Sequence, residues 1–546
     1  MIIDHYYSSI EKSNFYLGMI SQVNRSNSTI QVENLSLLNY RKIKLETLIP
    51  NTINYYVVID SSQGLFIGEI YQSKVNSTDS VHESMNNGKK DIIFPEISID
   101  VIGLLSPNGQ FKLSGFKTVG ITDKVYIANQ ELLKKYLNSI EINKYYLDEE
   151  QKISQSKLKN VAKLEGFNSE YLSLQPNTLF DRHLMVIGTT NSGKSTSALS
   201  ILDKLVLTGR KILIIDPTGE YRKTFHDHEV SKYTLGVDTF LSTKNVSEMD
   251  WIKLFGVEND PNKASVLANA ITSLKYQFSI NQKDNVLIKE DKTVASIQSL
   301  LAQFSGDNTK EFNLSQLEEQ IKKEAVKEDK TNHKYKSDGN LYNALIWLLQ
   351  KISYYKNQTR LIDFFNAPNS NDKKLFEEIN KFTDKKNKKS MYIDASEIGT
   401  NEGIGAVIVD MISNYLINLD ISNTSPFILF VDEVHRYTKM NVDEQIGLTS
   451  IAREGRKKGI FLFLTTQNPK DVPEILLGQI GSLIIHRITQ SEEIKTIQNH
   501  LQFNTLPHIQ KLNQGEAIIT SINLLRDIHV VFEKCMRKHN NCTPIL

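Results

Sequence analysis

Residues 188–195 read Gly-Thr-Thr-Asn-Ser-Gly-Lys-Ser, which fills every fixed position of an eight-residue phosphate-binding loop. The loop follows the apolar run 184–187 and precedes a helical pattern with leucines at 199, 202 and 205. Glycines let the backbone curl until successive N–H groups point at a phosphate, and the amino end of the helix adds positive potential. This strand–loop–helix unit favours a parallel α/β sheet that binds a nucleotide.

Individual residues of the loop have separate expected roles. The Lys194 ammonium group would reach the β- and γ-phosphates of ATP, and the Ser195 hydroxyl would ligate Mg²⁺. The other nucleotide contacts are expected from their neighbours in the loop and the first helical turn, namely Gly188, Thr190, Asn191, Ser192, Gly193 and Thr196.

Two acids, Asp432 and Glu433, follow the apolar run 427–431. Ligands of an open parallel sheet bind at the carboxyl ends of the strands, so both carboxylates are expected to face the nucleotide. Asp432 would hold the Mg²⁺ shell through water, and Glu433 would polarise the attacking water. The second acid indicates hydrolysis, because a protein that only binds a nucleotide does not need it.

The segment before and after the apolar run 460–464 supplies three more candidates. Gln467 follows the run and is expected to sense the γ-phosphate or orient water, with a turn-capping amide as the alternative. Arg453 and Arg456 precede it, at the place where ring-forming ATPases put an arginine finger. Arg456 is favoured over Arg453, and an ordinary solvated charge is the alternative for both.

Four further residues keep open roles. Asp216 and Glu220 belong to the segment Asp-Pro-Thr-Gly-Glu-Tyr, where Asp216 is equally compatible with a metal contact and with holding a turn. Arg487 is compatible with a phosphate sensor in its own chain or with an exposed charge. His435 is not expected to be catalytic, since it lies where a residue would cap the next helix.

The rest of the chain divides into regions that differ in the pattern of their apolar residues. Continuous apolar runs suited to buried parallel strands recur after residue 160, at 184–187, 211–215, 391–393, 427–431, 460–464 and 483–485. Residues 1–125 instead alternate short β-branched and aromatic runs with turns, which predicts a small β-barrel. Between 246 and 386 the strands stop and helical periodicity takes over. The lysines of 321–330 are interleaved with acids, which favours a solvated surface over a nucleic-acid contact.

Composition limits the class of protein. At 546 residues the chain is too long for one ordinary domain. Its 64 Lys and Arg nearly balance 63 Asp and Glu, which argues against a surface that coats nucleic acid and leaves a local basic pore open. The two cysteines, Cys535 and Cys542, exclude a disulfide framework and a zinc module. Without an apolar run of about 18 residues or a signal peptide, a soluble cytoplasmic protein without membrane contact is expected.

An ordered series of motifs resembles the HerA branch of the HerA–FtsK superfamily of ring ATPases, and Phe66-Ile-Gly-Glu-Ile70 looks like part of its assembly barrel. Asn191 departs from the family, which commonly has a second glycine there; asparagine tolerates left-handed backbone angles, so binding should survive. The series comprises the loop at 188–195, Asp216-Pro-Thr-Gly-Glu-Tyr221, Asp250-Trp-Ile-Lys-Leu-Phe-Gly256, Asp432-Glu433, Gly455-Arg-Lys457, Thr466-Gln467, Gly515-Glu-Ala-Ile-Ile519 and His529-Val-Val-Phe532.

The resemblance implies an α/β fold: a RecA-like P-loop NTPase core with a parallel sheet, an N-terminal small β-barrel of the HAS-barrel kind and a helical insertion. The expected boundaries are 1–125 for the barrel, 126–175 for a connector, 176–245 and 387–500 for the core, 246–386 for the insertion, and 501–546 for C-terminal strands bracing the core. It also implies a homohexamer with ATP and Mg²⁺ at subunit interfaces and double-stranded DNA in the pore.

A partner is implied as well, an effector protein docked on the N-terminal barrel face: a nuclease or a sirtuin-type NADase, in anti-phage defence or DNA end processing. The leading hypothesis is therefore an ATP-hydrolysing DNA translocase of the helicase type. The alternative is an ATP-regulated hexameric scaffold that assembles and activates the effector without processive translocation. A DNA pump of the FtsK or conjugation type is less favoured, because neither a membrane segment nor a winged-helix-like C-terminal domain is recognised.

Overall fold

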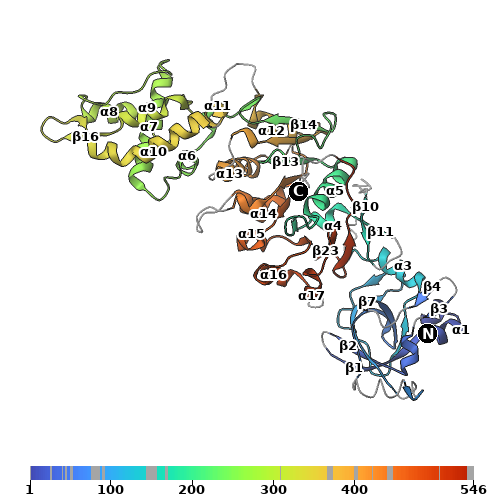
Figure 1. Cartoon of the computed structure of the whole chain (residues 1–546). Coiled ribbons are helices and arrows are strands. Elements are labelled where there is room, and N and C mark those ends of the chain that lie inside the picture. The colour runs from blue at the N-terminus through green and yellow to red at the C-terminus, as the bar shows by residue number, and fades with distance from the viewer. Residues whose placement is uncertain are drawn as a thin grey trace, which may run out of the picture. The chain divides into compact units, whose positions relative to one another are not determined.

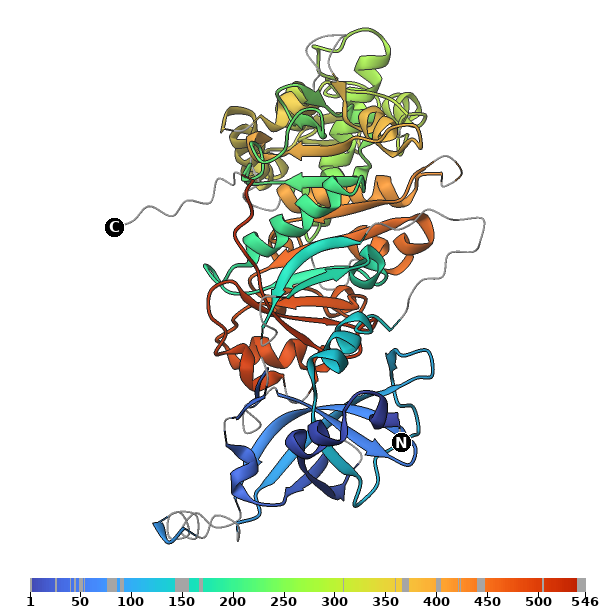
Figure 2. The same ribbon diagram turned by 90° about the vertical axis from the view of Figure 1, so that its right-hand side faces the viewer.

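The computed structural model describes residues 2–537 apart from 25–26, 40, 44–45, 49–52, 54, 76–85, 89–92, 143–156, 166–169, 308, 359, 366–372, 399–403, 421, 423, 439–446 and 503–504. Cys542 therefore lies outside the described residues. The chain forms two compact units: unit 1 comprises residues 1–179 and 481–533, and unit 2 comprises residues 180–480 and 534–546. Figures 1 and 2 show the path of the chain through both.

The amino-terminal part of unit 1 is a barrel of antiparallel strands, drawn in blue in Figure 1. Its order is β2-β1-β9-β5-β6-β7-β8, and β2 also pairs with β7, which closes the sheet and confirms the predicted barrel. Alternate residues such as Leu17, Ile59 and Phe66 point inward and form its apolar core. The strands are β1 (Tyr16–Val23), β2 (Ser28–Val32), β5 (Tyr56–Ser61), β6 (Gly64–Lys74), β7 (Glu96–Leu105), β8 (Phe111–Lys112) and β9 (Lys124–Ile127).

Unit 1 also contains an antiparallel ladder built from both ends of the sequence. Its order is β11-β10-β24-β23-β22. The run 483–485, predicted as one more parallel strand, pairs antiparallel with β23 within this unit. The strands are β10 (Leu158–Leu164), β11 (Tyr171–Leu174), β22 (Ser482–Ile485), β23 (Glu516–Ser521) and β24 (Ile528–Val531); the helices of unit 1 include α1 (Ser9–Phe15), α3 (Gln130–Asn138), α16 (Ser491–Ile497) and α17 (Leu506–Ile509).

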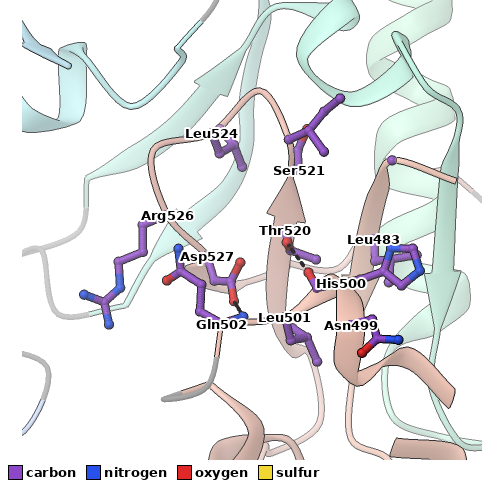
Figure 3. A pocket seen from close by; sticks show the side chains of 12 residues that line it. Leu483, Asn499, His500, Leu501, Gln502, Thr520, Ser521, Leu524, Arg526 and Asp527 are labelled. Atoms are coloured by element: carbon purple, nitrogen blue, oxygen red, sulfur yellow. Dashed lines mark hydrogen bonds between the residues drawn. The ribbon is translucent and has the colours of Figure 1, made fainter. Parts of the chain in front are cut away.

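A buried arginine ties the C-terminal part of unit 1 to the barrel. Arg526 Nη1 lies 2.6 Å from Glu69 Oε2 on β6 and 3.5 Å from Asp100 Oδ2 on β7. Arg526 also lines the polar cavity of about 270 Å³ shown in Figure 3. There the Gln502 N–H donates to the Asp527 carboxylate at 3.0 Å, as Figure 3 shows. Because a buried charge needs a partner, the contacts of Arg526 with Glu69 and Asp100 hold the C-terminal part of unit 1 on the barrel.

Unit 2 is built on a parallel sheet in the order β12-β21-β20-β13-β19-β14. All residues of β12, β13 and β20 are buried, as expected of strands covered on both faces. The predicted parallel α/β core is confirmed. Its strands are β12 (Leu184–Ile187), β13 (Ile212–Asp216), β14 (Val230–Thr234), β19 (Ser390–Asp394), β20 (Phe427–Val431) and β21 (Ile460–Thr466); its helices include α5 (Lys194–Leu207), α12 (Leu375–Thr383), α13 (Ile404–Ile417), α14 (Gly447–Glu454) and α15 (Glu474–Leu477).

Between β14 and β19 the chain forms a mainly helical insertion, drawn in green and yellow in Figure 1. No strands were predicted between 246 and 386, and the structure contradicts this at two places. There β16 (Val326–Asp329) and β17 (Lys334–Ser337) form an antiparallel hairpin, and β18 (Lys373–Lys374) pairs with β15 (Thr239–Phe240). Hairpin lysines pair with nearby acids, as in the 3.5 Å contact between Lys327 and Asp338. The helices are α6 (Glu248–Phe255), α7 (Pro261–Ser279), α8 (Val294–Leu301), α9 (Leu317–Lys323), α10 (Gly339–Gln358) and α11 (Leu361–Phe365). In the described part of the chain no helix is long and apolar enough to cross a bilayer.

Candidate nucleotide site

Three strands of unit 2 bring the predicted residues to one edge of the sheet. Ile187 at the end of β12 is level with Thr466 of β21, and Val431 at the end of β20 is level with Leu464. The phosphate-binding loop, the acids Asp432 and Glu433, and Gln467 each follow one of these strands directly. The carboxyl edge of the parallel sheet therefore gathers them, as such sheets gather ligand-binding residues.

The backbone of the loop has the curled form that a phosphate requires. Gly193 has φ 113°, a value suited to glycine, and α5 begins at the next residue with no side-chain cap at its amino end. Asn191 has φ 64°, the left-handed conformation that asparagine tolerates better than most residues. The Ser192 hydroxyl donates to the Thr189 carbonyl oxygen at 2.7 Å and braces the loop. The first N–H groups of α5 are thus directed at the site.

Lys194 and Gln467 both contact the same oxygen of Glu433. Lys194 Nζ forms an ion pair with Glu433 Oε1, and both side chains are largely buried. Gln467 Nε2 donates to that oxygen at 2.6 Å. The Oε1 atom of Gln467 accepts a hydrogen bond from the Thr190 hydroxyl at 2.8 Å. Gln467 therefore links the phosphate-binding loop to the acid expected to activate water.

Glu433 is held in an uncommon conformation. Its backbone lies in the left-handed region, with φ 49°, and its N–H donates to the Thr465 hydroxyl at 2.9 Å. His435 Nδ1 lies 3.2 Å from Oε2, although no aligned hydrogen bond reaches that oxygen from the described residues. Burial raises the pKa of Glu433, but His435, Lys194 and Gln467 outweigh it and lower the pKa to about 2. The side chain is therefore a carboxylate at neutral pH, with Oε2 available to a water molecule.

Asp432, which is predicted to hold Mg²⁺ together with Ser195, is buried beside two hydroxyl groups. The Thr465 hydroxyl donates to Asp432 Oδ1, and the Tyr221 hydroxyl lies 3.4 Å from Oδ2. Burial raises the pKa of Asp432, and a bound cation would favour its charged form. No cluster of three His, Cys, Asp or Glu side chains with metal-site geometry occurs in the described residues. A magnesium ion here would therefore depend on Ser195, Asp432 and the oxygens of a nucleotide.

The open roles of two other acids become clearer. Both carboxylate oxygens of Asp216 accept hydrogen bonds, among them those from the Tyr392 hydroxyl at 2.8 Å and the Gly219 N–H at 2.9 Å. This pattern favours Asp216 as the holder of a turn. Burial, followed by the charges of Asp432 and Asp216, raises the pKa of Glu220 to about 7. Glu220 thus adds a fourth carboxyl group to the electrostatics of the site, beside Asp216, Asp432 and Glu433.

The two candidate arginines lie elsewhere. Arg453 is exposed at the end of α14, and Arg456 lies in the short helix η11 (Gly455–Lys458), which precedes β21. Six residue steps along β21 span about 20 Å, which separates Arg456 from the carboxyl edge of its own sheet. Arg487 is exposed and belongs to unit 1. The structure therefore brings Thr190, Lys194, Asp432, Glu433 and Gln467 together and leaves these arginines outside.

Thr465 was not predicted from the sequence. It is fully buried, donates to one acid and accepts from the backbone of the next. The only available signal was its position two residues before Gln467, on the strand next to the one that delivers the acids.

The chain is similar to known proteins over most of its length. Residues 160–414 match the family model "Helicase HerA, central domain", and residues 420–537 match "Helicase HerA-like C-terminal". The chain is 22% identical over 476 residues to a probable helicase of Methanocaldococcus jannaschii, covering 83% of this chain and 81% of that protein. It is 25% identical over 365 residues to the DNA double-strand break repair helicase HerA of Sulfolobus acidocaldarius, covering 66% of each.

Among solved structures, the plasmid coupling protein TrwB in complex with ADP and Mg²⁺ is similar with a TM-score of 0.45 and 15% identity, over 68% of this chain and 89% of that one. VirB4 of Thermoanaerobacter pseudethanolicus is similar with a TM-score of 0.45 and 14% identity, over 65% of this chain and 90% of that one.

Proposed function

Since this chain belongs to the HerA–FtsK superfamily of ATPases and is an ATP-hydrolysing enzyme of the DNA helicase or translocase type, we propose that it translocates double-stranded DNA. The observation that supports a hydrolytic motor best is the placement of Glu433. This ionised carboxylate lies between the phosphate-loop lysine and Gln467, and Gln467 in turn contacts the loop. Through this connection a nucleotide bound in the loop would influence the acid.

In this proposal each side chain has one task. Lys194 and the N–H groups at the start of α5 bind the β- and γ-phosphates, and Glu433 Oε2 accepts the proton of the attacking water. Gln467 orients Glu433 and the loop with respect to each other. Bound Mg²⁺, held by Ser195 and Asp432, would supply charge neutralisation for the phosphate oxygens.

Arg456 can contribute only to a nucleotide site that two subunits form together. Because it lies about 20 Å from the carboxyl edge of its own sheet, it can reach a nucleotide only on a neighbouring subunit. A closed ring, such as the homohexamer expected from the family, joins neighbouring subunits through two different faces. In this proposal one subunit's amino edge lies beside the next subunit's nucleotide. Arg456 would then act in trans as an arginine finger.

Mixing two defective variants tests this arrangement. Glu433→Gln and Arg456→Ala proteins should each hydrolyse ATP poorly, whereas the mixture should recover activity after subunit exchange. About a quarter of the interfaces in a random equal mixture combine an intact acid with an intact arginine. If a mixture with demonstrated exchange stays inactive, Arg456 does not act in trans.

Translocation itself is tested with DNA. We expect linear duplex DNA to stimulate ATP hydrolysis, and we expect the protein to displace a third strand from a triplex while it hydrolyses ATP. DNA binding should weaken steeply as salt rises, because contacts to phosphates release counterions. Hydrolysis that ignores DNA, together with an undisturbed triplex, would instead support an ATP-regulated scaffold.

The expected effector partner would dock on the barrel. The loop between β8 and β9 exposes three large apolar side chains, Leu113, Phe116 and Ile121. Phe116 is fully exposed, although the loop is braced by hydrogen bonds such as that from Gly120 N to Asp123 Oδ2 at 2.6 Å. An ordered apolar tip of this kind is typical of a protein contact. That the partner is a nuclease or an NADase, in anti-phage defence or DNA end processing, stays a prediction.

Co-purification with the product of a neighbouring gene checks the docking proposal. Phe116→Ser should lose the complex and keep the ATPase activity, because the loop takes no part in the nucleotide site. Met19→Ser, on the outside of barrel strand β1, is the matched control and should keep both. A complex that survives Phe116→Ser would place the contact elsewhere.

A further inference from the structure

The turn that leads into β12 lies beside the arginine-bearing helix η11. It comprises Asp181, Arg182 and His183, between α4 (Pro176–Phe180) and β12. Because β12 and β21 are parallel and adjacent, the residues before both strands share the amino edge of the sheet. Two side chains of this turn contact η11 or the residues that flank it.

Asp181 holds the guanidinium group of Arg456 directly. Arg456 Nη2 lies 2.7 Å from Asp181 Oδ1. The two side chains differ in exposure, since that of Arg456 is 55% exposed and that of Asp181 is 15% exposed. The aspartate is therefore the fixed member of the pair, and the arginine projects past it into solvent. One nitrogen of the guanidinium group contacts Asp181, so the other N–H donors of Arg456 can face a neighbouring subunit.

His183 fixes the backbone on both sides of η11. Its Nδ1 accepts the Leu462 N–H at 2.9 Å, and its Nε2 lies 3.0 Å from the Ala452 carbonyl oxygen. Since Nδ1 accepts, the proton is on Nε2, which donates to that carbonyl. Burial lowers the pKa of His183, so the ring stays neutral near pH 7. His183 also has a left-handed backbone, with φ 61°, which is uncommon for a residue other than glycine.

We propose that Asp181 is a positioning residue that aims Arg456 at the nucleotide of the neighbouring subunit, on a platform fixed by His183. This inference rests on the proposed function of Arg456 in trans. It adds a role for the α4–β12 turn, which none of the sequence motifs includes. A free arginine on the surface samples many rotamers. An arginine held by a largely buried carboxylate, such as that of Asp181, has lost most of that freedom before the subunits meet.

Kinetics of single variants give the first test. Asp181→Ala should lower kcat about 10- to 100-fold, because a small displacement of a charged group at the transition state has that effect. KM for ATP should stay within about twofold, since Lys194 and the loop are untouched. Asp181→Glu, which keeps the carboxylate, should recover part of kcat. Asp227→Asn, which breaks the exposed 2.9 Å pair with Lys232, is the matched control and should behave as wild type.

Mixing experiments give the second test, which a merely structural role would not pass. Asp181→Ala subunits keep an intact acid, so Glu433→Gln subunits should rescue them by supplying a well-held arginine. Arg456→Ala subunits should not rescue them, because neither variant then offers a correctly placed finger. This asymmetry puts the defect of Asp181→Ala on the arginine side of the interface.

Each outcome is decisive. Wild-type kcat in Asp181→Ala, or equal rescue by both partners, would overturn the positioning role. Failure of the Glu433→Gln and Arg456→Ala mixture would remove the finger itself, and Asp181 with it. If that mixture recovers and the Asp181→Ala mixture with Glu433→Gln does not, the finger stands and Asp181 acts only on folding. Should Asp181→Ala fail to fold, Asp181→Asn carries the same mixing test with the side-chain shape retained.

Discussion

Lys194 and Glu433, 239 residues apart in the chain, form a buried ion pair at the carboxyl edge of the parallel sheet. Their side chains are 6% and 13% exposed, so the attraction between them is only weakly screened. A phosphate bound in the loop would compete with Glu433 for the same ammonium group. This competition would couple nucleotide binding to the release of Glu433 through one side chain.

Removing the lysine should abolish nucleotide binding. In Lys194→Ala we expect affinity for ATP to fall at least about 100-fold, because a charge-assisted contact to the phosphates is lost. Binding of a fluorescent ATP analogue measures this. Lys204→Ala, near the other end of α5, is the control and should bind normally. Retained affinity in Lys194→Ala would show that the loop does not hold the phosphates.

Glu433→Gln should separate binding from hydrolysis. The amide keeps the shape of the side chain and cannot accept the proton of the attacking water, so turnover should fall about 100- to 10 000-fold. Affinity for ATP should persist or rise, since the phosphates no longer compete with a carboxylate for Lys194. Single-turnover hydrolysis and equilibrium binding check the two parts. Glu474→Gln, an exposed acid on α15, controls for the loss of charge; a wild-type rate in Glu433→Gln would contradict the assignment.

The buried ion pairs of Arg526 predict a large effect on the stability of unit 1. Arg526→Ala leaves Glu69 and Asp100 unpaired, at a cost of about 3–5 kcal/mol in the free energy of unfolding. Lys74→Ala, which breaks the exposed 3.1 Å pair with Glu96, should cost less than about 1 kcal/mol. Urea unfolding of the full chain, followed by a probe in the barrel, measures both.

That loss should also depend on pH. Burial raises the pKa of Glu69 and of Asp100 even in the presence of Arg526. Without the arginine both values rise further, so the folded variant binds protons more readily than its unfolded chain. Its stability therefore increases as pH falls through the folded pKa values, and the deficit relative to wild type shrinks. A deficit that grows towards acid pH would contradict this account.

For the C-terminal segment of unit 2 we expect the opposite dependence of stability on pH. Arg537 contacts both carboxylate oxygens of Glu229 at 2.7 Å, and this contact lowers the pKa of Glu229 from 4.5 to about 2. The stabilisation is present above about pH 4.5 and is lost as pH falls towards 2. Arg537→Gln should therefore destabilise the protein near neutral pH and converge with wild type in acid. Paired unfolding curves across that range check it, and parallel curves would contradict it.

The local motifs were predictable and the contacts between them were not. The loop at 188–195 and the pair Asp432 and Glu433 stand next to short apolar runs, so their placement followed from a few neighbouring residues. The hydrogen bond from Thr190 to Gln467 joins residues 277 apart, and the ion pair between Arg456 and Asp181 depends on which strands are adjacent. Strand order is a tertiary property that no local pattern encodes.

Two errors in the fold have similar causes. The apolar run 483–485 has the composition of a buried strand, and composition does not show direction, so its antiparallel pairing with β23 was missed. The β16–β17 hairpin was missed because lysines and acids occupy most of its positions. Its strands show no apolar alternation, and the hairpin is short.

Gln467 provides the last prediction, because it touches both the loop and the acid. Gln467→Ala removes the bond to Glu433 and the bond from Thr190 together, so kcat should fall about 10- to 100-fold while KM for ATP changes little. Thr190→Val removes only the contact with the loop. If Gln467 transmits nucleotide occupancy to Glu433, Thr190→Val should lower the stimulation of hydrolysis by DNA more than the basal rate. Gln467→Glu is the complementary change. The new carboxylate beside Glu433 should raise the pKa of Glu433, so the acid limb of the kcat–pH profile should move to higher pH. Equal, small effects of all three substitutions would show that Gln467 only caps the end of β21.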